Sequence, residues 1–250
     1  MIEPPTISFL RSANGERIAC RVRPGGAPAI VFLPGYASDM EGAKALAVDA
    51  FAAERGLACV RFDYSGTGSS EGAFEDATLD RWLDESLAVV DQLTAGPLIL
   101  VGSSMGGWLA LLIAARRPGR IKAIVGIATA LDFTEWGFGP ADRDRLTRDG
   151  RIAETNPDGS PGRFFTQAFW QSGQQLQLLG SPIAVDCPVR LIHGDADDLV
   201  PVSIATRTMD RLRSADVQLT IVKGGGHRLS EPREIDTILR TLESLLEPVR

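Results

Sequence analysis

The residue types needed for acyl transfer are all present in this 250-residue chain, beginning with a serine in a distinctive setting. Ser104 lies in the segment Gly102–Gly106, which matches the pattern G-x-S-x-G. The apolar run Leu98–Val101 precedes this segment and a helix-forming run follows it, as a nucleophile on a sharp strand-to-helix turn requires. The competing interpretation is a plain glycine-rich turn that caps a helix, a role that would suit Ser103 better. We therefore predict that Ser104 is a nucleophile.

A base must accept the proton of that serine, and the chain has only two histidines. His227 follows three glycines, just after the predicted strand Val217–Val222 and before the last helical segment. Loops at the carboxyl ends of strands are where catalytic residues of open α/β sheets lie. His193 ends the run Val189–Ile192, and we expect it to pack at the end of that strand. His227 is therefore the predicted base.

A third residue must orient the histidine, and three aspartates compete for that task. Asp195, Asp197 and Asp198 all lie on the loop that follows the same predicted strand. The acid would hold one ring N–H of His227 and stabilise the imidazolium that forms during attack. Their positions alone do not choose among the three.

Two backbone N–H groups are candidates for binding the negative charge that develops on the carbonyl oxygen. The N–H of Met105 opens a predicted helix, where unpaired donors and the helix dipole favour an anion. The N–H of Tyr36 lies just after the predicted strand Ala29–Leu33, where a second donor is expected. Each such donor contributes about 3 kcal/mol of transition-state stabilisation in comparable enzymes.

No cofactor or metal is expected from the motifs. The segment Asp63–Ser70 contains Gly-x-Gly after a strand, but it lacks the third glycine of a dinucleotide fingerprint and the Gly-Lys-Ser/Thr of a P-loop. We interpret it as a structural turn. The histidines and cysteines do not have the spacing of metal ligands.

Strands and helices alternate along most of the chain, which predicts an α/β fold with a mostly parallel sheet flanked by helices. The first two strands flank the turn signal Asn14-Gly15. The predicted strands are Ile7–Leu10, Ile18–Val22, Ala29–Leu33, Ala58–Phe62, Leu98–Val101, Ile121–Ile127, Val189–Ile192 and Val217–Val222. The predicted helices are Met40–Arg55 with Asp39 as its cap, Thr78–Leu93, Met105–Arg117, Ser203–Leu212 and Glu231–Leu246.

The alternation stops between Leu131 and Ser181, where no clean strand is visible. We interpret this stretch as a small cap inserted into a single domain that spans residues 1–250. Its aromatic residues could cover an apolar acyl pocket or could pack the cap onto the sheet, and both interpretations stay open. These residues are Trp136, Phe138, Phe164, Phe165, Phe169 and Trp170.

Composition excludes several classes of function. The formal net charge is −6 and no basic cluster is present, which argues against nucleic-acid binding. No apolar run approaches the length of a membrane span, and the segment Met1–Arg11 lacks the pattern of a signal peptide. Of the three cysteines, Cys20 and Cys59 lie in apolar runs and should be buried. We expect a soluble protein of a reducing compartment, the cytoplasm, unless a transit peptide directs a longer precursor elsewhere. The oligomeric state is not indicated.

In five segments the chain resembles the α/β-hydrolase-domain serine hydrolases. More narrowly, it resembles the mitochondrial palmitoyl-protein thioesterases that also hydrolyse acyl glucuronides, and their bacterial relatives. The resemblance runs from about Ala29 to the last helix, although the cap matches in position better than in sequence. The segments are Phe32–Tyr36, Arg61–Gly66, Val101–Trp108, Pro188–Gly194 and His227–Arg228.

The resemblance implies an α/β-hydrolase fold and selects Asp197 as the acid, through the family pattern His-Gly-x-x-Asp-x-x-Val-Pro. It also implies a serine hydrolase of ester or thioester bonds that acts on a small-molecule or lipid-modified acyl substrate through an acyl-enzyme. Three alternatives stay open: a small-ester carboxylesterase or lipase, a proline-type serine aminopeptidase, and a non-catalytic binding protein on the same fold.

Overall fold

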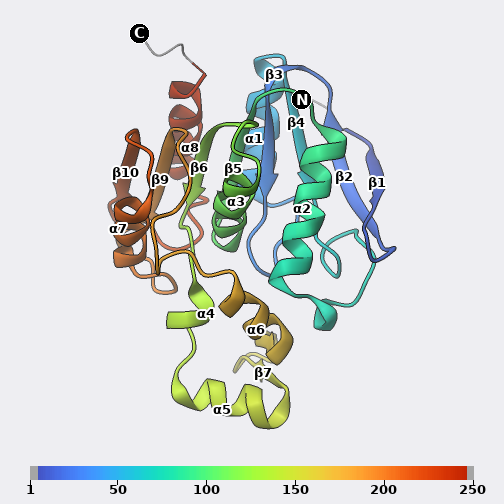
Figure 1. Cartoon of the computed structure of the whole chain (residues 1–250), viewed down its shortest axis with the longest axis vertical. Helices are drawn as coiled ribbons and strands as arrows, with labels where there is room; N and C mark the ends of the chain where they lie inside the picture. The colour runs from blue at the N-terminus through green and yellow to red at the C-terminus, as the bar shows by residue number, and fades with distance from the viewer. Residues whose placement is uncertain (1–4, 247–250) are drawn as a thin grey trace.

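The computed structural model describes residues 5–246 of the chain (Figure 1). Residues 1–4, which belong to the segment examined above for a targeting signal, and residues 247–250 lie outside the described part. An eight-stranded sheet forms the centre, in the order β1-β2-β4-β3-β5-β6-β9-β10. The strands, in that order, are Ile7–Arg11, Arg17–Arg23, Leu57–Phe62, Gly26–Leu33, Leu98–Ser103, Ile121–Ile127, Val189–Gly194 and Val217–Val222.

The sheet is mostly parallel, as predicted from the alternation. Only the pairs β1–β2 and β2–β4 are antiparallel, and β1 and β2 form the predicted hairpin. From β4 through β10 every neighbouring pair is parallel. All six residues of β5 are buried, because helices cover both faces of the sheet at this point. The arrangement is that of the α/β-hydrolase fold.

Helices cover both faces, and each face has its own apolar cluster. The helices α2 (Leu79–Leu93), α3 (Met105–Arg116) and α7 (Val202–Arg211) pack on one face, where Trp82 and Trp108 are fully buried. The helices α1 (Ala43–Glu54) and α8 (Pro232–Ser244) pack on the other face, through side chains that include Phe51 and Leu242. Cys20 and Cys59 are buried, as predicted. No helix within residues 5–246 is long and apolar enough to cross a membrane.

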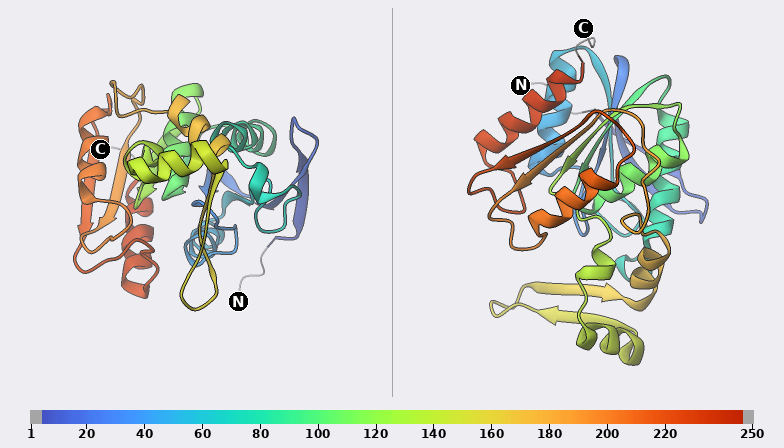
Figure 2. Two further views of the ribbon diagram at one scale, coloured as in Figure 1. Left: turned by 90° about the horizontal axis from the view of Figure 1, so that it is seen from below. Right: turned by 60° about the vertical axis from the view of Figure 1, so that its left-hand side comes forward.

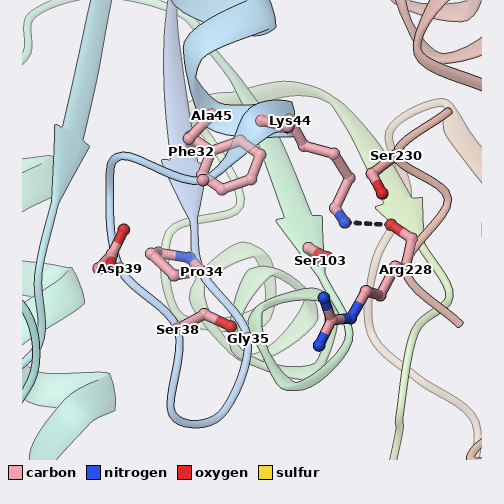
Figure 3. Close-up of a pocket in the computed structure, with 12 residues that line it drawn as sticks. Phe32, Pro34, Gly35, Ser38, Asp39, Lys44, Ala45, Ser103, Arg228 and Ser230 are labelled. Carbon is pink, nitrogen blue, oxygen red and sulfur yellow. Dashed lines mark hydrogen bonds between the residues drawn. The ribbon is translucent and has the colours of Figure 1, made fainter. Parts of the chain in front are cut away.

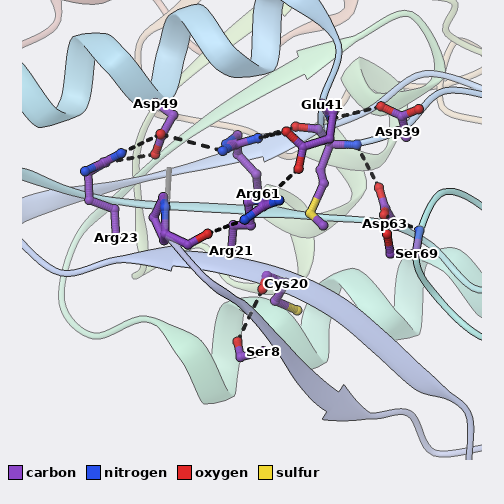
Figure 4. A network of polar contacts seen from close by, with 12 residues as sticks. Ser8, Cys20, Arg21, Arg23, Asp39, Glu41, Asp49, Arg61, Asp63 and Ser69 are labelled. Atoms are coloured by element: carbon purple, nitrogen blue, oxygen red, sulfur yellow. Dashed lines mark hydrogen bonds and ion pairs between the residues drawn. The ribbon is translucent and has the colours of Figure 1, made fainter. Parts of the chain in front are cut away.

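Helix α1 begins later than predicted. It starts at Ala43 rather than at Met40, and its N-cap is Gly42, so Asp39 is not its cap. The side chain of Asp63 accepts a hydrogen bond from the N–H of Met40 (2.7 Å), and buried Arg61 donates to the carbonyl of Met40 (Figure 4). These two bonds from the end of β4 hold residues 34–42 as a loop. The spacing of apolar residues within the segment carries no information about these distant partners.

The segment 131–181, called here the cap segment, contains a hairpin that the sequence did not predict. Strands β7 (Arg151–Thr155) and β8 (Pro161–Thr166) pair antiparallel and project from the body of the molecule in the right-hand view of Figure 2. The stretch between them contains Asp158-Gly159, a residue pair typical of hairpin turns. Strands β7 and β8 pair outside the main sheet. Apolar alternation is weak in β7, where Ile152 is the one buried residue.

Short helices complete the cap segment: α4 (Phe133–Trp136), α5 (Pro140–Asp149) and α6 (Gln167–Gln175). The carboxylate of Asp132 accepts hydrogen bonds from the N–H groups of Leu178 and Leu179, which joins the beginning of the segment to its end. The hydroxyl of Ser172 donates to Asp80 on α2 at 2.6 Å, which anchors α6 to the core. The cap segment therefore lies across one end of the strands of the main sheet (Figure 1).

At this end lie the carboxyl termini of the parallel strands β3, β5, β9 and β10. Because parallel strands run in the same direction, the loops that follow them meet on one side of the sheet. Those loops carry Tyr36, Ser104, Asp197 and His227, so the sheet collects residues that are far apart in the chain.

Candidate active site

Ser104 lies on a sharp turn between β5 and α3, as predicted. Its backbone is strained, with φ of 54° and ψ of −119°, in a region that non-glycine residues rarely occupy. A Cβ at Gly102 would lie 2.3 Å from the carbonyl oxygen of Gly106, and a Cβ at Gly106 would lie 2.1 Å from that of Leu33. Both flanking glycines are therefore required by the close approach of backbone to backbone, and the turn lifts the serine side chain off the sheet.

The three side chains singled out in the sequence form one hydrogen-bonded chain. His227 Nε2 lies 3.0 Å from the Oγ of Ser104, and His227 Nδ1 lies 2.8 Å from Oδ2 of Asp197. Because a carboxylate only accepts, Nδ1 carries a proton, which leaves Nε2 of a neutral ring free to accept the serine hydroxyl. This tautomer is the one a general base for Ser104 requires.

Asp197 has the environment of an ionised orienting group. Its side chain is fully buried, and its Oδ1 accepts hydrogen bonds from the N–H groups of Leu199 (2.9 Å) and Val200 (2.8 Å). Burial acts to raise the pKa of this carboxyl, but the hydrogen bonds from His227, Val200 and Leu199 outweigh it and lower the pKa below its ordinary value. The group therefore carries its negative charge at neutral pH.

The two competing aspartates point elsewhere. Asp195 pairs with the ammonium of Lys223 at 2.6 Å and accepts the N–H of Gly224 at 2.6 Å, which organises the loop before His227. Asp198 is exposed to solvent. Of the three, Asp197 is the one whose carboxylate meets the ring of His227.

The two backbone N–H groups suggested for the oxyanion flank the serine. Met105 opens helix α3, and Gly35, the neighbour of Tyr36, lies so close that a Cβ there would be 3.3 Å from the Cβ of Ser104. Within residues 5–246, neither the N–H of Tyr36 nor that of Met105 donates to another group. Both N–H groups are therefore unpaired, one on the residue after Ser104 and the other on the residue after Gly35.

His193 has a closer relation to this site than the sequence suggested. It packs at the end of β9, as expected, but its Nε2 lies 2.9 Å from the carbonyl of Val200 and 3.3 Å from Oδ2 of Asp197. Both neighbours are acceptors, so Nε2 carries the proton, and the ring supports the loop that holds Asp197. The spacing of four residues between His193 and Asp197 was the signal available in the sequence.

The aromatic residues of the cap segment pack against the core. The ring of Tyr36 lies 4.6 Å from that of Phe165 and 4.9 Å from that of Phe169, and its hydroxyl donates to the carbonyl of Phe164 at 2.5 Å. Phe133 joins the same group, with its ring 6.0 Å from that of Phe165. We call Tyr36, Phe133, Phe165 and Phe169 the aromatic layer. It joins the cap segment, which contributes three of the rings, to the 34–42 loop, which contributes Tyr36.

The arrangement can carry out nucleophilic substitution at a carbonyl with groups from the polypeptide alone. It offers a hydroxyl beside a base, a buried charge behind the base, and two free N–H donors beside the hydroxyl. Among the described residues there is no group of three or more His, Cys, Asp or Glu side chains that could hold a metal ion.

Several known proteins resemble this chain in sequence and in fold. The family model described as the alpha/beta hydrolase family matches residues 30–236. A mitochondrial palmitoyl-protein thioesterase from Homo sapiens is 39% identical over 246 residues, covering 97% of this chain and 80% of the relative. Among solved structures, mouse alpha/beta hydrolase domain-containing protein 10 has a TM-score of 0.89 at 37% identity, covering 96% of this chain and 98% of the other. A putative hydrolase from Agrobacterium vitis S4 has a TM-score of 0.91 at 37% identity, with coverage of 98% and 100%.

Proposed function

Because this chain belongs to the α/β-hydrolase family and is a hydrolase of ester or thioester bonds, we propose that Ser104, His227 and Asp197 are its catalytic triad. The observation that carries the proposal is the continuous hydrogen-bonded chain from the hydroxyl of Ser104 through His227 to Asp197. The strained turn at Ser104 and the lowered pKa of Asp197 support it.

The proposed reaction has two steps. Ser104 attacks the carbonyl carbon while Nε2 of His227 takes its proton, and the tetrahedral oxyanion is held by the N–H groups of Tyr36 and Met105. His227 then returns the proton to the leaving group as the acyl-enzyme forms. Water, activated by the same Nε2, releases the acid. Asp197 keeps the ring oriented and stabilises its cation in both steps.

We propose that the substrates are acyl thioesters or activated esters of medium to long chain, as in an acyl-protein thioesterase or acyl-glucuronide esterase. The name of the 39% identical relative supports this class. The aromatic layer supports it as well, because Tyr36 follows Gly35, which lies against Ser104. The relative is also named mitochondrial, so the cytoplasmic location predicted from the sequence remains a prediction.

The test of the substrate class is kcat/KM across thioesters, p-nitrophenyl esters and aminoacyl amides of graded chain length. Each buried methylene should contribute about 0.8 kcal/mol, roughly a fourfold gain in kcat/KM. A maximum at acetyl or butyryl would identify a small-ester hydrolase, and rapid cleavage of aminoacyl amides would identify a peptidase.

Phe165→Ala should weaken that dependence on chain length, because it removes a ring of the aromatic layer beside Tyr36. The measurement is the slope of log kcat/KM against acyl carbon number, compared with the wild-type protein. Phe9→Ala is the matched control, since Phe9 is 45% exposed on β1 and should leave the slope unchanged. An unchanged slope for Phe165→Ala would mean that the acyl chain binds away from the aromatic layer.

Tyr36→Pro should lower kcat/KM by about 10²- to 10³-fold, because proline has no N–H to give the oxyanion. Tyr36→Phe keeps the N–H and loses only the bond to the carbonyl of Phe164, so its activity should fall by less than about tenfold. Thermal unfolding of both variants checks that the fold survives. Equal losses in the two variants would assign the effect to the cap contact instead of the N–H.

A further inference from the structure

A cleft of about 400 Å³ opens next to residues that adjoin the proposed triad, and no ring of the aromatic layer lines it (Figure 3). It lies between the 34–42 loop, the first turn of α1 and the loop that follows His227. Gly35 and Ser103 line it, and both adjoin Ser104, while Arg228 lines it and adjoins His227. We call it the polar cleft, because Ser38, Asp39, Lys44, Arg228 and Ser230 also form its walls.

Two cations in the polar cleft lack a carboxylate partner. The Lys44 ammonium donates to the carbonyl oxygen of Arg228, and Figure 3 shows both side chains reaching into the space from different walls. Within residues 5–246, no carboxylate lies within 4.0 Å of either charged group. Asp39 is in the wall, but its carboxylate accepts the N–H of Glu41, and Glu234 acts on Lys44 only at longer range.

The surroundings add further preference for an anion. Burial lowers the pKa of Lys44, and the neighbouring Arg228 lowers it further, as expected for two like charges without a counterion. Helix α1 has no acidic residue in its first turn and no side-chain cap, and its N-cap Gly42 and first residues line the same cleft. The hydroxyls of Ser38 and Ser230 could donate as well.

Its place beside His227 indicates which part of a substrate the cleft receives. When the tetrahedral intermediate collapses, the C–S or C–O bond breaks and its electron pair leaves with the sulfur or oxygen. Nε2 of His227 supplies the proton, so the leaving group lies on the histidine side. The ring of Tyr36 packs against Phe165 of the cap segment, whereas Gly35 and Ser38 of the same loop line the polar cleft.

We propose that the polar cleft is a leaving-group subsite in which Lys44 and Arg228 bind a carboxylate a few bonds from the cleaved bond. This inference rests on the proposed triad. It assigns the acyl chain and the leaving group to opposite sides of the 34–42 loop and makes Lys44 and Arg228 determinants of specificity.

The test compares two octanoyl thioesters that differ by one charge: that of N-acetylcysteine and that of its neutral amide. The wild-type protein should prefer the acid by about tenfold in kcat/KM, the scale of one hydrogen bond to a charged group. Lys44→Gln and Arg228→Gln should bring the ratio close to one, and Arg228→Lys should keep most of it. Lys122→Gln, which changes an exposed cation on β6, is the matched control and should leave the ratio unchanged.

A wild-type ratio of one or less, or a ratio that both glutamine variants preserve, would overturn the proposal. If Lys44 only supports the loop after His227, Lys44→Gln would lower kcat/KM equally for the acid and the amide and leave their ratio unchanged. That outcome would also count against the subsite. Octanoyl coenzyme A distinguishes the source of the anion, because its phosphates lie far from the thioester. If Lys44 and Arg228 matter only for that substrate, the carboxylate assignment is wrong.

Binding separates this proposal from that of the triad. In the Ser104→Ala background, calorimetric titration with the two thioesters should show about tenfold tighter binding of the acid, which Lys44→Gln removes. This preference is expected even if turnover uses another nucleophile. Equal affinities for the two thioesters would refute the subsite whatever the catalytic result.

Discussion

Replacing Ser104 with alanine is expected to lower kcat/KM for acyl thioesters by about 10⁴- to 10⁶-fold, the loss seen when a nucleophile is removed from a comparable triad. The reason is that the Oγ held 3.0 Å from Nε2 of His227 is the atom proposed to form the acyl-enzyme. A fluorophosphonate probe should label the wild-type protein once, at Ser104, and should not label the variant. Intact-mass measurement and peptide mapping provide the readout.

Ser203→Ala is the control for this experiment, because Ser203 is an exposed serine on α7 whose loss should affect neither labelling nor turnover. Labelling that persists in Ser104→Ala would refute the nucleophile assignment. A wild-type protein that never reacts with the probe would favour a binding protein built on the same fold.

Asp197→Asn is expected to lower kcat by about 10⁴-fold, by reversing the tautomer of the histidine. The N–H groups of Leu199 and Val200 require an acceptor, so the amide oxygen takes the place of Oδ1. The amide NH₂ then faces Nδ1 of His227, which must become the acceptor. Nε2 would consequently carry the proton and could no longer accept the hydroxyl of Ser104.

The matched controls lie on the same loop. Asp198→Asn changes an exposed side chain and should retain nearly full activity, and Asp195→Asn should cost far less than Asp197→Asn, because it weakens only the contact with Lys223. Steady-state kinetics of the three variants with one thioester settle the comparison. A collapse of activity in Asp198→Asn with an active Asp197→Asn would move the proposed acid to Asp198.

Patterns within short segments were enough to predict the sheet and the candidate site. The central strands are largely apolar runs, because both of their faces are covered by helices. The side chains that could take part in a reaction lie on the loops after those strands, and the carboxyl ends of parallel strands lie on the same side of the sheet. The sequence alone therefore predicted that Ser104 and His227 lie close together. In the structure, Oγ of Ser104 is 3.0 Å from Nε2 of His227.

Where a segment depends on distant partners, the sequence was a poorer guide. The apolar spacing after Asp39 predicted a helix from Met40, but bonds from Arg61 and Asp63 hold that stretch as a loop. In the cap segment, the β7–β8 hairpin has little alternation, since it pairs outside the main sheet. The spacing of the aromatic residues in the cap segment does not show whether these residues pack together or line a pocket.

The sequence by itself determined an α/β fold and the loops that carry Ser104, Asp197 and His227, because these follow from periodicity and from the direction of parallel strands. The resemblance to a known family implied the α/β-hydrolase class and selected Asp197 among the three aspartates. Only the tertiary structure decided how the loops around the serine pack, with an aromatic layer formed by Tyr36 and the cap segment and a polar cleft beside α1. Lys44 and Arg228 are 184 residues apart and share a cleft through the packing of α1 beside the loop after β10. Contacts between such distant residues depend on how helices and loops pack against the sheet, and no local pattern encodes that packing.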